Sequence, residues 1–270
     1  MTEPAARPLP LRTATAMFVR TLAVQASWNY ETMLGTGIGF SVEPALRALP
    51  GGRSGAAYHE ALARETHYFN AHPYLASVAV GALARVELDG SMPAAQIERF
   101  RIALCGSLGS VGDRLVWAGW LPFTVLVALL AYGLGAGPVL VVTLFLVLYN
   151  AGHVGLRIWG LRTGWSHGMS VAGSLATPIL RRGPEYVARA VMALCGLALP
   201  LASARILGRS GMEIAEIARK SVLGPHGLVF LLLAVGALLG ILLVKLHGRL
   251  DGWRVALLIV VLLALHSVAT

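Results

Sequence analysis

The chain has 270 residues, of which 56% are hydrophobic and only 13% are charged. A soluble domain usually carries about 25% charged residues, so this composition excludes an ordinary soluble protein and favours one that faces lipid. The net charge is +9, but Arg and Lys gather beside apolar segments. That pattern is typical of membrane-topology signals and anionic-lipid contacts, and it argues against nucleic-acid binding.

Cysteine and histidine usage indicates no metal centre. Cys105 and Cys195 lie far apart and form no CxxC pair, so neither a disulfide framework nor a zinc site is predicted. The histidines show no HExxH or comparable metal spacing. We expect no cofactor.

The first 110 residues are polar to amphipathic and contain no segment long enough to span a membrane. Apolar residues at helical spacing predict a helix over Ala14–Leu34, packed on protein or lying at the membrane surface. Gly35-Thr36-Gly37-Ile38-Gly39 follows it. This segment lacks the strand and the spacing of a dinucleotide-binding loop, so we interpret it as flexible or closely packed backbone.

Two further helices and one short apolar segment complete this front part. A helix is predicted over Tyr58–Phe69 and ends before His72, because Pro73 disfavours helical backbone at the residue before it. Ala76–Val86 is apolar but too short to span, so it either re-enters the membrane or packs against other subunits. Pro93 opens a helix that runs to about Leu104.

The back of the chain is strongly hydrophobic. No Asp, Glu, Lys or Arg occurs from Leu115 to Leu156, about twice the ~20 residues that cross a hydrocarbon core. Glycines and Pro138 divide this run near its middle. Five hydrophobic segments are predicted in all: Leu115–Leu134, Pro138–Leu156, Val187–Ile206, Leu228–Val244 and Val255–Thr270.

The predicted fold class is therefore an all-α polytopic membrane protein. Its N-terminal half, residues 1–110, is amphipathic and in part re-entrant, and residues 111–270 form the transmembrane region of one integrated unit. The basic loops Arg157–Arg189 and Lys245–Arg254 are predicted to face the cytoplasm, because Lys and Arg near span ends favour that side.

Several motifs, in this order along the chain, resemble one family of membrane proteins. They are Gln25-Ala26-Ser27-Trp28-Asn29-Tyr30-Glu31, Tyr68-Phe69-Asn70-Ala71-His72-Pro73-Tyr74-Leu75, Gly106-Ser107-Leu108-Gly109-Ser110-Val111-Gly112-Asp113 with Trp117, and Asn150 with Gly155-Leu156-Arg157, Gly160-Leu161-Arg162 and Gly164-Trp165. Together they resemble the IID membrane subunits of mannose/fructose/sorbose-type sugar phosphotransferase systems, over most of the chain.

The resemblance implies a multi-pass protein of the bacterial inner membrane. In the family, a IIC and a IID subunit together form the sugar path, and soluble IIA and IIB proteins relay phosphate to the incoming sugar. IID itself is not phosphorylated, so the resemblance implies no catalytic residue. The expected partners are a IIC subunit, IIA, IIB, membrane lipids and a hexose-type sugar. Ala76–Val86 and the glycine-rich Gly106–Gly112 are expected to be covered by IIC or another copy.

Three departures from the family pattern leave an alternative open. Arg114 follows the Gly-Asp pair where a small residue or Pro is common, His153 stands where Arg is common, and the region Leu207–Gly224 is shortened. A IID-like regulatory or assembly subunit without transport activity is therefore the runner-up. A membrane-embedded enzyme with Asp113 and His153 as acid and base is a third reading, which no nucleophile motif or metal cluster supports.

Sugar binding requires rigid hydrogen-bonding groups and an aromatic or apolar face. At the matched positions, the polar candidates for sugar binding or gating are Asn29, Glu31, Asn70, His72 and Asp113. The aromatic candidates for the sugar face are Trp28, Tyr30, Tyr74 and Trp117.

Each candidate has a structural alternative. Asp113 can end a helix or pair with Arg114 at the mouth of the uncharged segment, and its preceding glycines can let the backbone depart from helix. His72 can make a structural bond at the Pro73 turn, and Asn70 can satisfy free groups at a helix end. His153, on an apolar span, can be a packing histidine.

Overall fold

The computed structural model describes residues 8–171, 173 and 178–206, and all regular secondary structure in these residues is helical. Two isolated β-bridges join Met33 to Asn29 and to Phe69. The chain forms two compact units, one of Met1–Pro122 with Leu146–Val187, the other of Phe123–Phe145 with Ala188–Thr270. The boundaries fall inside helices α6, α7 and α9. The predicted division at residues 110 and 111 stays a prediction.

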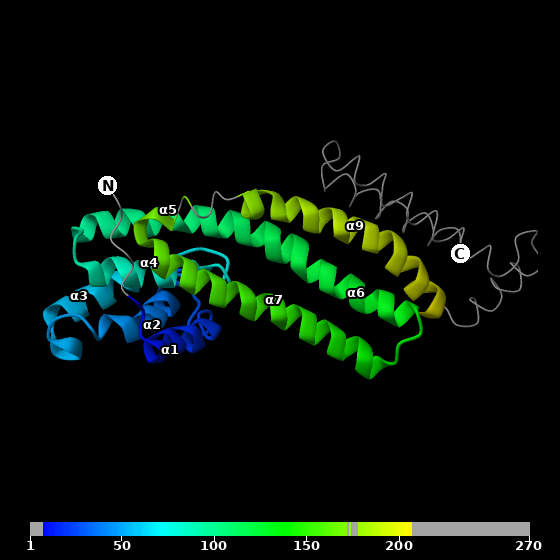
Figure 1. Ribbon diagram of the computed structural model, residues 1–270, viewed down its shortest axis with the longest axis horizontal. Coiled ribbons are helices and arrows are strands. Elements are labelled where there is room, and N and C mark those ends of the chain that lie inside the picture. Colours follow the sequence, from blue (N-terminus) through cyan, green and yellow to red (C-terminus); the bar gives the residue numbers. More distant parts are fainter. Residues whose placement is uncertain (1–7, 172, 174–177, 207–270) are drawn as a thin grey trace, which may run out of the picture. The chain divides into compact units, whose positions relative to one another are not determined.

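The front of the first unit is a group of short helices that lie together in Figure 1. They are α1 (Leu11–Leu22), α2 (Gly35–Leu46), the 3-10 turn η1 (Gly52–Ser54), α3 (Ala56–Glu65) and α4 (Ala76–Asp89). The predicted helices Ala14–Leu34 and Tyr58–Phe69 are each too long at their C-terminal end. The first helix ends at Leu22, where Ala23 and Val24 donate to the carbonyl oxygens three residues back and begin a series of turns. Further on, Asn29 Oδ1 accepts the N–H groups of Glu31 and Thr32 in a local turn that competes with helix.

The glycine-rich segment is the start of helix α2. A Cβ at Gly35 would lie 2.0 Å from the His67 carbonyl oxygen, and one at Gly37 would lie 1.9 Å from the Val24 carbonyl oxygen. Only glycine allows neighbouring backbone this close. Of the two interpretations, closely packed backbone is the one confirmed.

Helix α4 is the centre of the core, where Val78, Ala79, Val80, Ala82 and Leu83 are fully buried. A Cβ at Gly164 of α7 would lie 2.0 Å from the Val78 carbonyl oxygen, so the two helices cross at backbone contact. The chain's own helices cover Ala76–Val86, so packing against other subunits is not what buries it, and its re-entry into the membrane stays a prediction.

Helix α5 (Ala94–Gly112) continues without a break into a π-helix, η2 (Asp113–Trp120), and then into α6 (Leu121–Gly133). The predicted end at Leu104 is therefore too early. Residues 106–112 are helical, so their backbone groups are satisfied within the helix. Their cover by IIC or by another copy stays a prediction. The backbone departs from α-helical geometry only after these glycines, at Asp113.

Helix α7 (Pro138–His167) extends the predicted span Pro138–Leu156 by eleven residues and is followed by the 3-10 turn η3 (Gly168–Ser170). Helix α9 (Pro178–Ile206) contains the predicted span Val187–Ile206. Arg157–Arg189 is therefore not a loop, because it begins inside α7 and ends inside α9; the side of the membrane stays a prediction.

Three helices in the described residues are long and apolar enough to cross a membrane: Ala94–Gly133, Pro138–Ser170 and Arg182–Ser203. The second contains the predicted span Pro138–Leu156, and the other two cover all but the last residues of the predicted spans Leu115–Leu134 and Val187–Ile206. The predicted spans Leu228–Val244 and Val255–Thr270, and the basic stretch Lys245–Arg254, lie outside the described residues.

In the second unit, α6 and α9 pack through small residues. A Cβ at Gly133 would lie 2.6 Å from Leu201 Cβ and 2.9 Å from the Ala202 nitrogen. Arg205 covers the end of α6, since its guanidinium lies 4.3 Å from the centre of the Tyr132 ring and donates to the carbonyl oxygens of Tyr132 and Ala136. A cation at a helix C-terminus stabilises the exposed carbonyl groups there.

Candidate functional site

The π-helix η2 exposes a polar and aromatic face next to the core. Gly112, Val116 and Gly119 are buried, whereas Asp113, Arg114 and Trp117 are exposed. A π-helix has a wider turn than an α-helix, which keeps Asp113 and Trp117, four residues apart, close to one face. Such segments are rare and occur often at functional sites.

His72 lies directly behind this face. A Cβ at Gly112 would lie 2.2 Å from His72 Cβ, so the π-helix begins in contact with the histidine. His72 is 1% exposed, and its Nδ1 accepts the N–H of Tyr74 at 3.2 Å. The ring proton of the neutral form is therefore on Nε2, which has no hydrogen-bond partner in the described residues. Burial, and then the charge of Arg157, lower the His72 pKa to about 4.

Tyr74 is the centre of a ring cluster. Its ring stacks on His153 with centroids 4.3 Å apart, meets the His72 ring edge-on at 5.0 Å and lies 6.1 Å from the Trp117 ring. Its hydroxyl is 2.6 Å from that of Tyr149. Burial, followed by this hydrogen bond, raises the pKa of Tyr74, so its hydroxyl stays protonated at neutral pH.

Arg157 of α7 also contacts the cluster. It is 2% exposed, and its guanidinium lies 4.9 Å from the Tyr74 ring centre. Its Nε donates to His153 Nε2 at 2.8 Å, and Nη1 donates to the Thr21 carbonyl oxygen of α1. No carboxylate lies within ion-pair distance of Arg157 in the described part of the chain. No carboxylate in the described residues therefore neutralises the guanidinium charge, which instead faces the Tyr74 ring.

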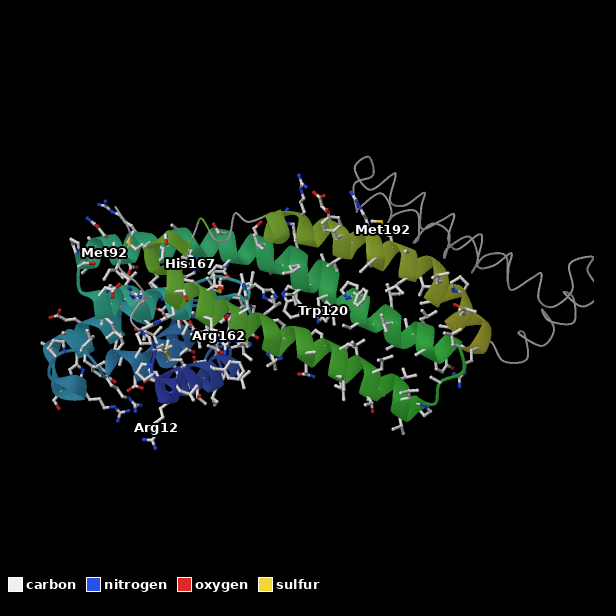
Figure 2. The ribbon with its side chains drawn as sticks, viewed as in Figure 1. Arg12, Met92, Trp120, Arg162, His167 and Met192 are labelled. Carbon is white, nitrogen blue, oxygen red and sulfur yellow. The ribbon has the colours of Figure 1, made fainter. Side chains whose placement is uncertain are left out.

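We call His72, Tyr74, Trp117, Tyr149, His153 and Arg157 the Tyr74 cluster. Trp120 fixes η2 against α7 beside it, and Figure 2 shows its side chain directed towards α7. The indole Nε1 donates to the Tyr149 carbonyl oxygen at 3.4 Å, and a Cβ at Gly152 would lie 2.2 Å from it. Residues far apart in the sequence are thereby held in one rigid arrangement.

Two exposed groups of η2 lie on this face. Trp117 has a ring that is 44% exposed, and Asp113 has an exposed carboxylate on the same π-helix, whereas the unpartnered His72 Nε2 behind them is buried. Rings with a few convergent polar groups suit a polyhydroxylated ligand. His153 already uses Nε2 to accept a hydrogen bond, which removes that nitrogen as a base. No group of three or more His, Cys, Asp or Glu in the described residues could hold a metal ion.

Other predicted residues lie outside the Tyr74 cluster. The amide of Asn29 is engaged with its own loop, through Ser27 and Thr32. The rings of Trp28 and Tyr30 contact one another edge-on at 4.8 Å. Glu31 and Asn70 are exposed. Their part in sugar binding stays a prediction.

Asp113 and Arg114 do not form the ion pair that was the structural alternative for Asp113. No ion pair of Asp113 occurs in the described residues, and Arg114 Nε instead donates to the Ser110 carbonyl oxygen at 3.3 Å. The Asp113 carboxylate is therefore exposed and available.

Sequence reasoning missed Tyr149 and Arg157 and interpreted His153 as a packing residue. A signal for them exists, because Tyr149, His153 and Arg157 follow one another at four-residue spacing along α7. Side chains four apart on a helix share a face. The contact of that face with Tyr74, 75 positions away in the sequence, is not visible in the spacing.

Two other charged clusters in the first unit serve packing. Arg101 is fully buried and donates to the carbonyl oxygens of Glu65, His67 and Tyr68 at the end of α3 and to the Glu65 carboxylate at 3.3 Å. Arg64 pairs with Glu87 through two bonds of 2.8 Å. Burial raises the pKa of Glu65, against the opposing charge of Arg101.

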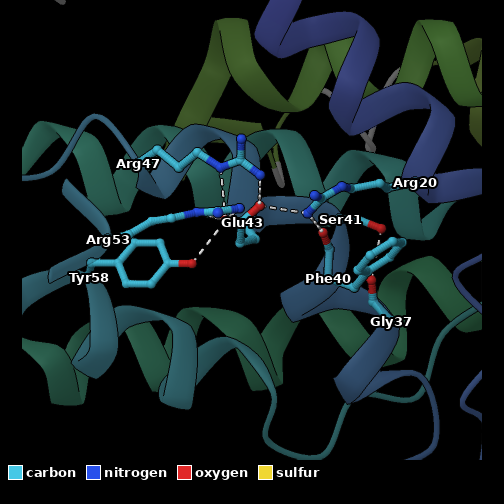
Figure 3. A network of polar contacts seen from close by, with 8 residues as sticks. All are labelled: Arg20, Gly37, Phe40, Ser41, Glu43, Arg47, Arg53 and Tyr58. Atoms are coloured by element: carbon cyan, nitrogen blue, oxygen red, sulfur yellow. Dashed lines mark hydrogen bonds and ion pairs between the residues drawn. The ribbon is translucent and has the colours of Figure 1, made fainter.

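The second packing cluster surrounds Glu43 of α2. Figure 3 shows its carboxylate enclosed by Arg20, Arg47, Arg53 and Tyr58. The nearest guanidinium nitrogens, of Arg20 and Arg47, are both 2.7 Å away. The hydrogen bond from Arg47, followed by those from Tyr58, Arg53 and Arg20, outweighs the effect of burial and lowers the Glu43 pKa to about 2.

The helical fold and the three long apolar helices found in the described residues define the class of an integral membrane protein. Within that class, the family model for the mannose/fructose/sorbose IID component of the phosphotransferase system matches residues 9–196. The chain belongs to this family.

Characterised relatives agree with this assignment. The mannose-specific EIID component of Escherichia coli (strain K12) is 27% identical over 212 residues, which cover 73% of each chain. The fructose permease IID component of Bacillus subtilis (strain 168) is 33% identical over 171 residues, 60% of this chain and 58% of that protein. The sorbose-specific EIID component of Klebsiella pneumoniae is 29% identical over 174 residues, 63% of this chain and 62% of that protein.

Solved structures share the fold. A chain in the cryo-EM structure of the mannose transporter ManYZ in complex with microcin E492 is similar over 97% of each chain, with a TM-score of 0.53 and 22% identity. A second structure, described as a membrane protein, is similar over 97% of this chain and 98% of its own, with a TM-score of 0.62 and 21% identity.

Proposed function

We propose that this chain pairs with a IIC membrane subunit, and that the two form the path by which a hexose-type sugar enters the cell and is phosphorylated by IIB. The observation that carries the proposal is the match of the IID family model over residues 9–196. Support comes from the solved chain of ManYZ, a structure described as a mannose transporter. Soluble IIA and IIB proteins relay the phosphate, and this chain contributes no catalytic group.

We further propose that the sugar is contacted by the exposed face of η2 and the Tyr74 cluster behind it. Trp117 supplies the ring face against the apolar side of the sugar, and Asp113 accepts a hydrogen bond from a hydroxyl. A charged acceptor makes a stronger bond to a hydroxyl than a neutral one does. Tyr74, His153 and Arg157 hold Trp117 and His72 in place.

The cellular setting follows from the same proposal. The chain is a multi-pass protein of the bacterial inner membrane, and residues 1–110 and 111–270 act as parts of one IID unit. Support comes from three candidate spans in the described residues and from the basic residues at their ends.

The test is phosphoenolpyruvate-dependent sugar uptake into vesicles that contain IIA, IIB and IIC, with this chain omitted or restored. We expect uptake only when the chain is present. Equal uptake without it would contradict the proposal. If the chain stabilises IIC but uptake of every hexose tested stays at background, it is an assembly subunit instead.

A further inference from the structure

The outer face of helix α1 is apolar where a surface helix is usually polar. Leu11, Val19 and Leu22 are 82%, 55% and 47% exposed. They follow the helical repeat with Thr15 between them, so they form one stripe along the helix. An open groove of about 600 Å³ runs along this stripe and is lined by Leu11, Arg12, Thr15, Ala16, Val19 and Arg20.

A second, basic hollow adjoins the groove. It has a volume of about 360 Å³ and is lined by Arg12, Thr13, Ala16, Pro44, Arg47 and Ala48. Arg12 and Ala16 belong to both, so the apolar groove opens into the basic hollow beside Arg12. Arg12 is exposed, and Figure 2 shows its side chain directed away from α1.

The Glu43 cluster contributes Arg47 to the hollow and Arg20 to the adjoining groove. Three guanidinium groups, of Arg20, Arg47 and Arg53, share the single carboxylate of Glu43, which leaves two net positive charges. The contacts with Glu43 fix these long side chains in place before any ligand arrives, so the cost of ordering them is already met.

Helix α1 lies at the level where α7 leaves the apolar region. Arg157 is the first charged residue after the uncharged run that begins at Leu115, and it donates to the Thr21 carbonyl oxygen in the last turn of α1. The first charged residue after an apolar span marks the membrane interface. An amphipathic helix at that depth places its apolar face at the boundary between headgroups and acyl chains.

We infer that the α1 groove binds an anionic phospholipid of the surrounding membrane. Arg12 and Arg47 hold the phosphate and headgroup, and an acyl chain lies along Leu11, Thr15 and Val19. An acidic protein surface would match only the arginines and would leave the apolar stripe in water, whereas a lipid matches both halves of the site. The inference depends on the membrane class of the chain and not on sugar transport.

The test measures retained lipid on the full-length chain in detergent by native mass spectrometry, with phosphatidylglycerol and phosphatidylcholine of equal chain length as probes. We expect preferential retention of phosphatidylglycerol. Arg12→Gln should weaken that retention about fivefold, since a basic residue near the membrane surface contributes about 1 kcal/mol. The matched control is Arg99→Gln, which removes one exposed positive charge from α5 without touching the groove, and it should retain the lipid normally.

A second variant, Val19→Glu, tests the apolar half and should reduce retention of both lipids. Equal retention of the two lipids by the unaltered chain, or an equal loss in Arg12→Gln and Arg99→Gln, would overturn the inference. Displacement of the lipid by glycerol 1-phosphate alone would show a site for a soluble anion. Release of the lipid on addition of IIC would show that this face is a subunit interface.

Discussion

Two arginines among the described residues of the first unit are buried, and their surroundings differ in kind. Arg101 is fully buried and Arg157 is 2% exposed. Arg101 faces the Glu65 carboxylate and three carbonyl oxygens. Arg157 faces one carbonyl oxygen, a histidine and a tyrosine ring. A buried cation is expensive unless it is paired, and of these two only Arg101 lies within ion-pair distance of a carboxylate in the described residues.

The two surroundings differ in what neutralises the charge. Around Arg101, the guanidinium donates to oxygens of Glu65, His67 and Tyr68 and joins α5 to the end of α3, while Glu65 Oε1 has no hydrogen-bond partner in the described residues. Around Arg157, the guanidinium faces the Tyr74 ring and His153 Nε2, and the neighbouring His72 Nε2 has no partner in the described residues. The exposed Trp117 ring beside this cluster is the part that we propose contacts the sugar. The following predictions test that distinction.

The largest effect is expected for Arg101→Leu. The Glu65 side chain and three carbonyl oxygens lose their buried donor, and each buried group left unsatisfied typically costs about 1–3 kcal/mol. The unfolding temperature in detergent and the amount of protein in the membrane should both fall sharply. Adding Glu65→Gln should restore part of the loss, because no buried group that can ionise then remains at the end of α3. Normal stability of the single variant would contradict the structural role.

The raised pKa of Glu65 predicts the direction in which the stability of the folded protein changes with pH. Burial raises its pKa in the folded protein above the ordinary value of 4.5, so the folded state holds the proton more tightly than the unfolded state does. The resulting stabilisation is complete below pH 4.5 and is lost as pH rises through the raised pKa. Glu65→Gln should flatten the curve of unfolding temperature against pH in that window. An unchanged curve would show that Arg101 keeps Glu65 ionised.

The next effect concerns the exposed carboxylate of the π-helix. Asp113→Asn keeps the shape and removes a charge-assisted hydrogen bond, so apparent sugar affinity should weaken by about 1.5–3 kcal/mol, roughly tenfold to hundredfold. Assembly with IIC and thermal stability should be unchanged, because Asp113 makes no ion pair in the described residues.

The double variant Asp113→Asn with Arg114→Gln is the control for that result. If Asp113 pairs with Arg114 after all, the single change lowers stability and the double change restores it. If Asp113 contacts sugar, transport stays impaired in both. Normal uptake by Asp113→Asn at normal membrane abundance would remove Asp113 from the sugar site.

A smaller effect is expected at Glu43. Its pKa is lowered to about 2 from 4.5, so its stabilising contribution is present above pH 4.5 and is lost as pH falls towards 2. The side chains of Arg47 and Arg53 are 44% and 62% exposed, and solvent screening therefore reduces the stabilisation from their ion pairs with Glu43. Glu43→Gln should therefore cost about 1–2 kcal/mol at neutral pH, with less difference from the unaltered protein near pH 2. Thermal unfolding across that pH range checks this, and a constant difference would contradict it.

The sequence predicts the helical membrane class well, because the uncharged run from Leu115 to Leu156 has one physical explanation. It also places His72, Tyr74 and Trp117 among the candidate residues, and the structure brings these three together. Helix ends were less predictable. The turn after α1 depends on the amide of Asn29, and the helical glycines of α2 depend on the backbone of residues 24 and 67.

Burial of charge could not be predicted in the same way. Arg101, Glu65 and Glu87 stand among polar residues, where an amphipathic surface helix is the simpler expectation. Their burial follows from the close crossing of α4 by neighbouring helices, which is a tertiary effect. The membership of Arg157 in the cluster likewise depends on how α1, α4 and α7 meet.

The most direct test of the central claim compares two tryptophans of equal exposure. Trp117, in the Tyr74 cluster, and Trp28, in the loop after α1, are each 44% exposed. In the IIC–IID complex, Trp117→Leu should weaken equilibrium sugar binding about tenfold, because an aromatic contact contributes about 0.5–1.5 kcal/mol beyond its buried area. Trp28→Leu should leave binding unchanged. Equal losses in both variants, or a loss confined to Trp28→Leu, would contradict a sugar site at the π-helix.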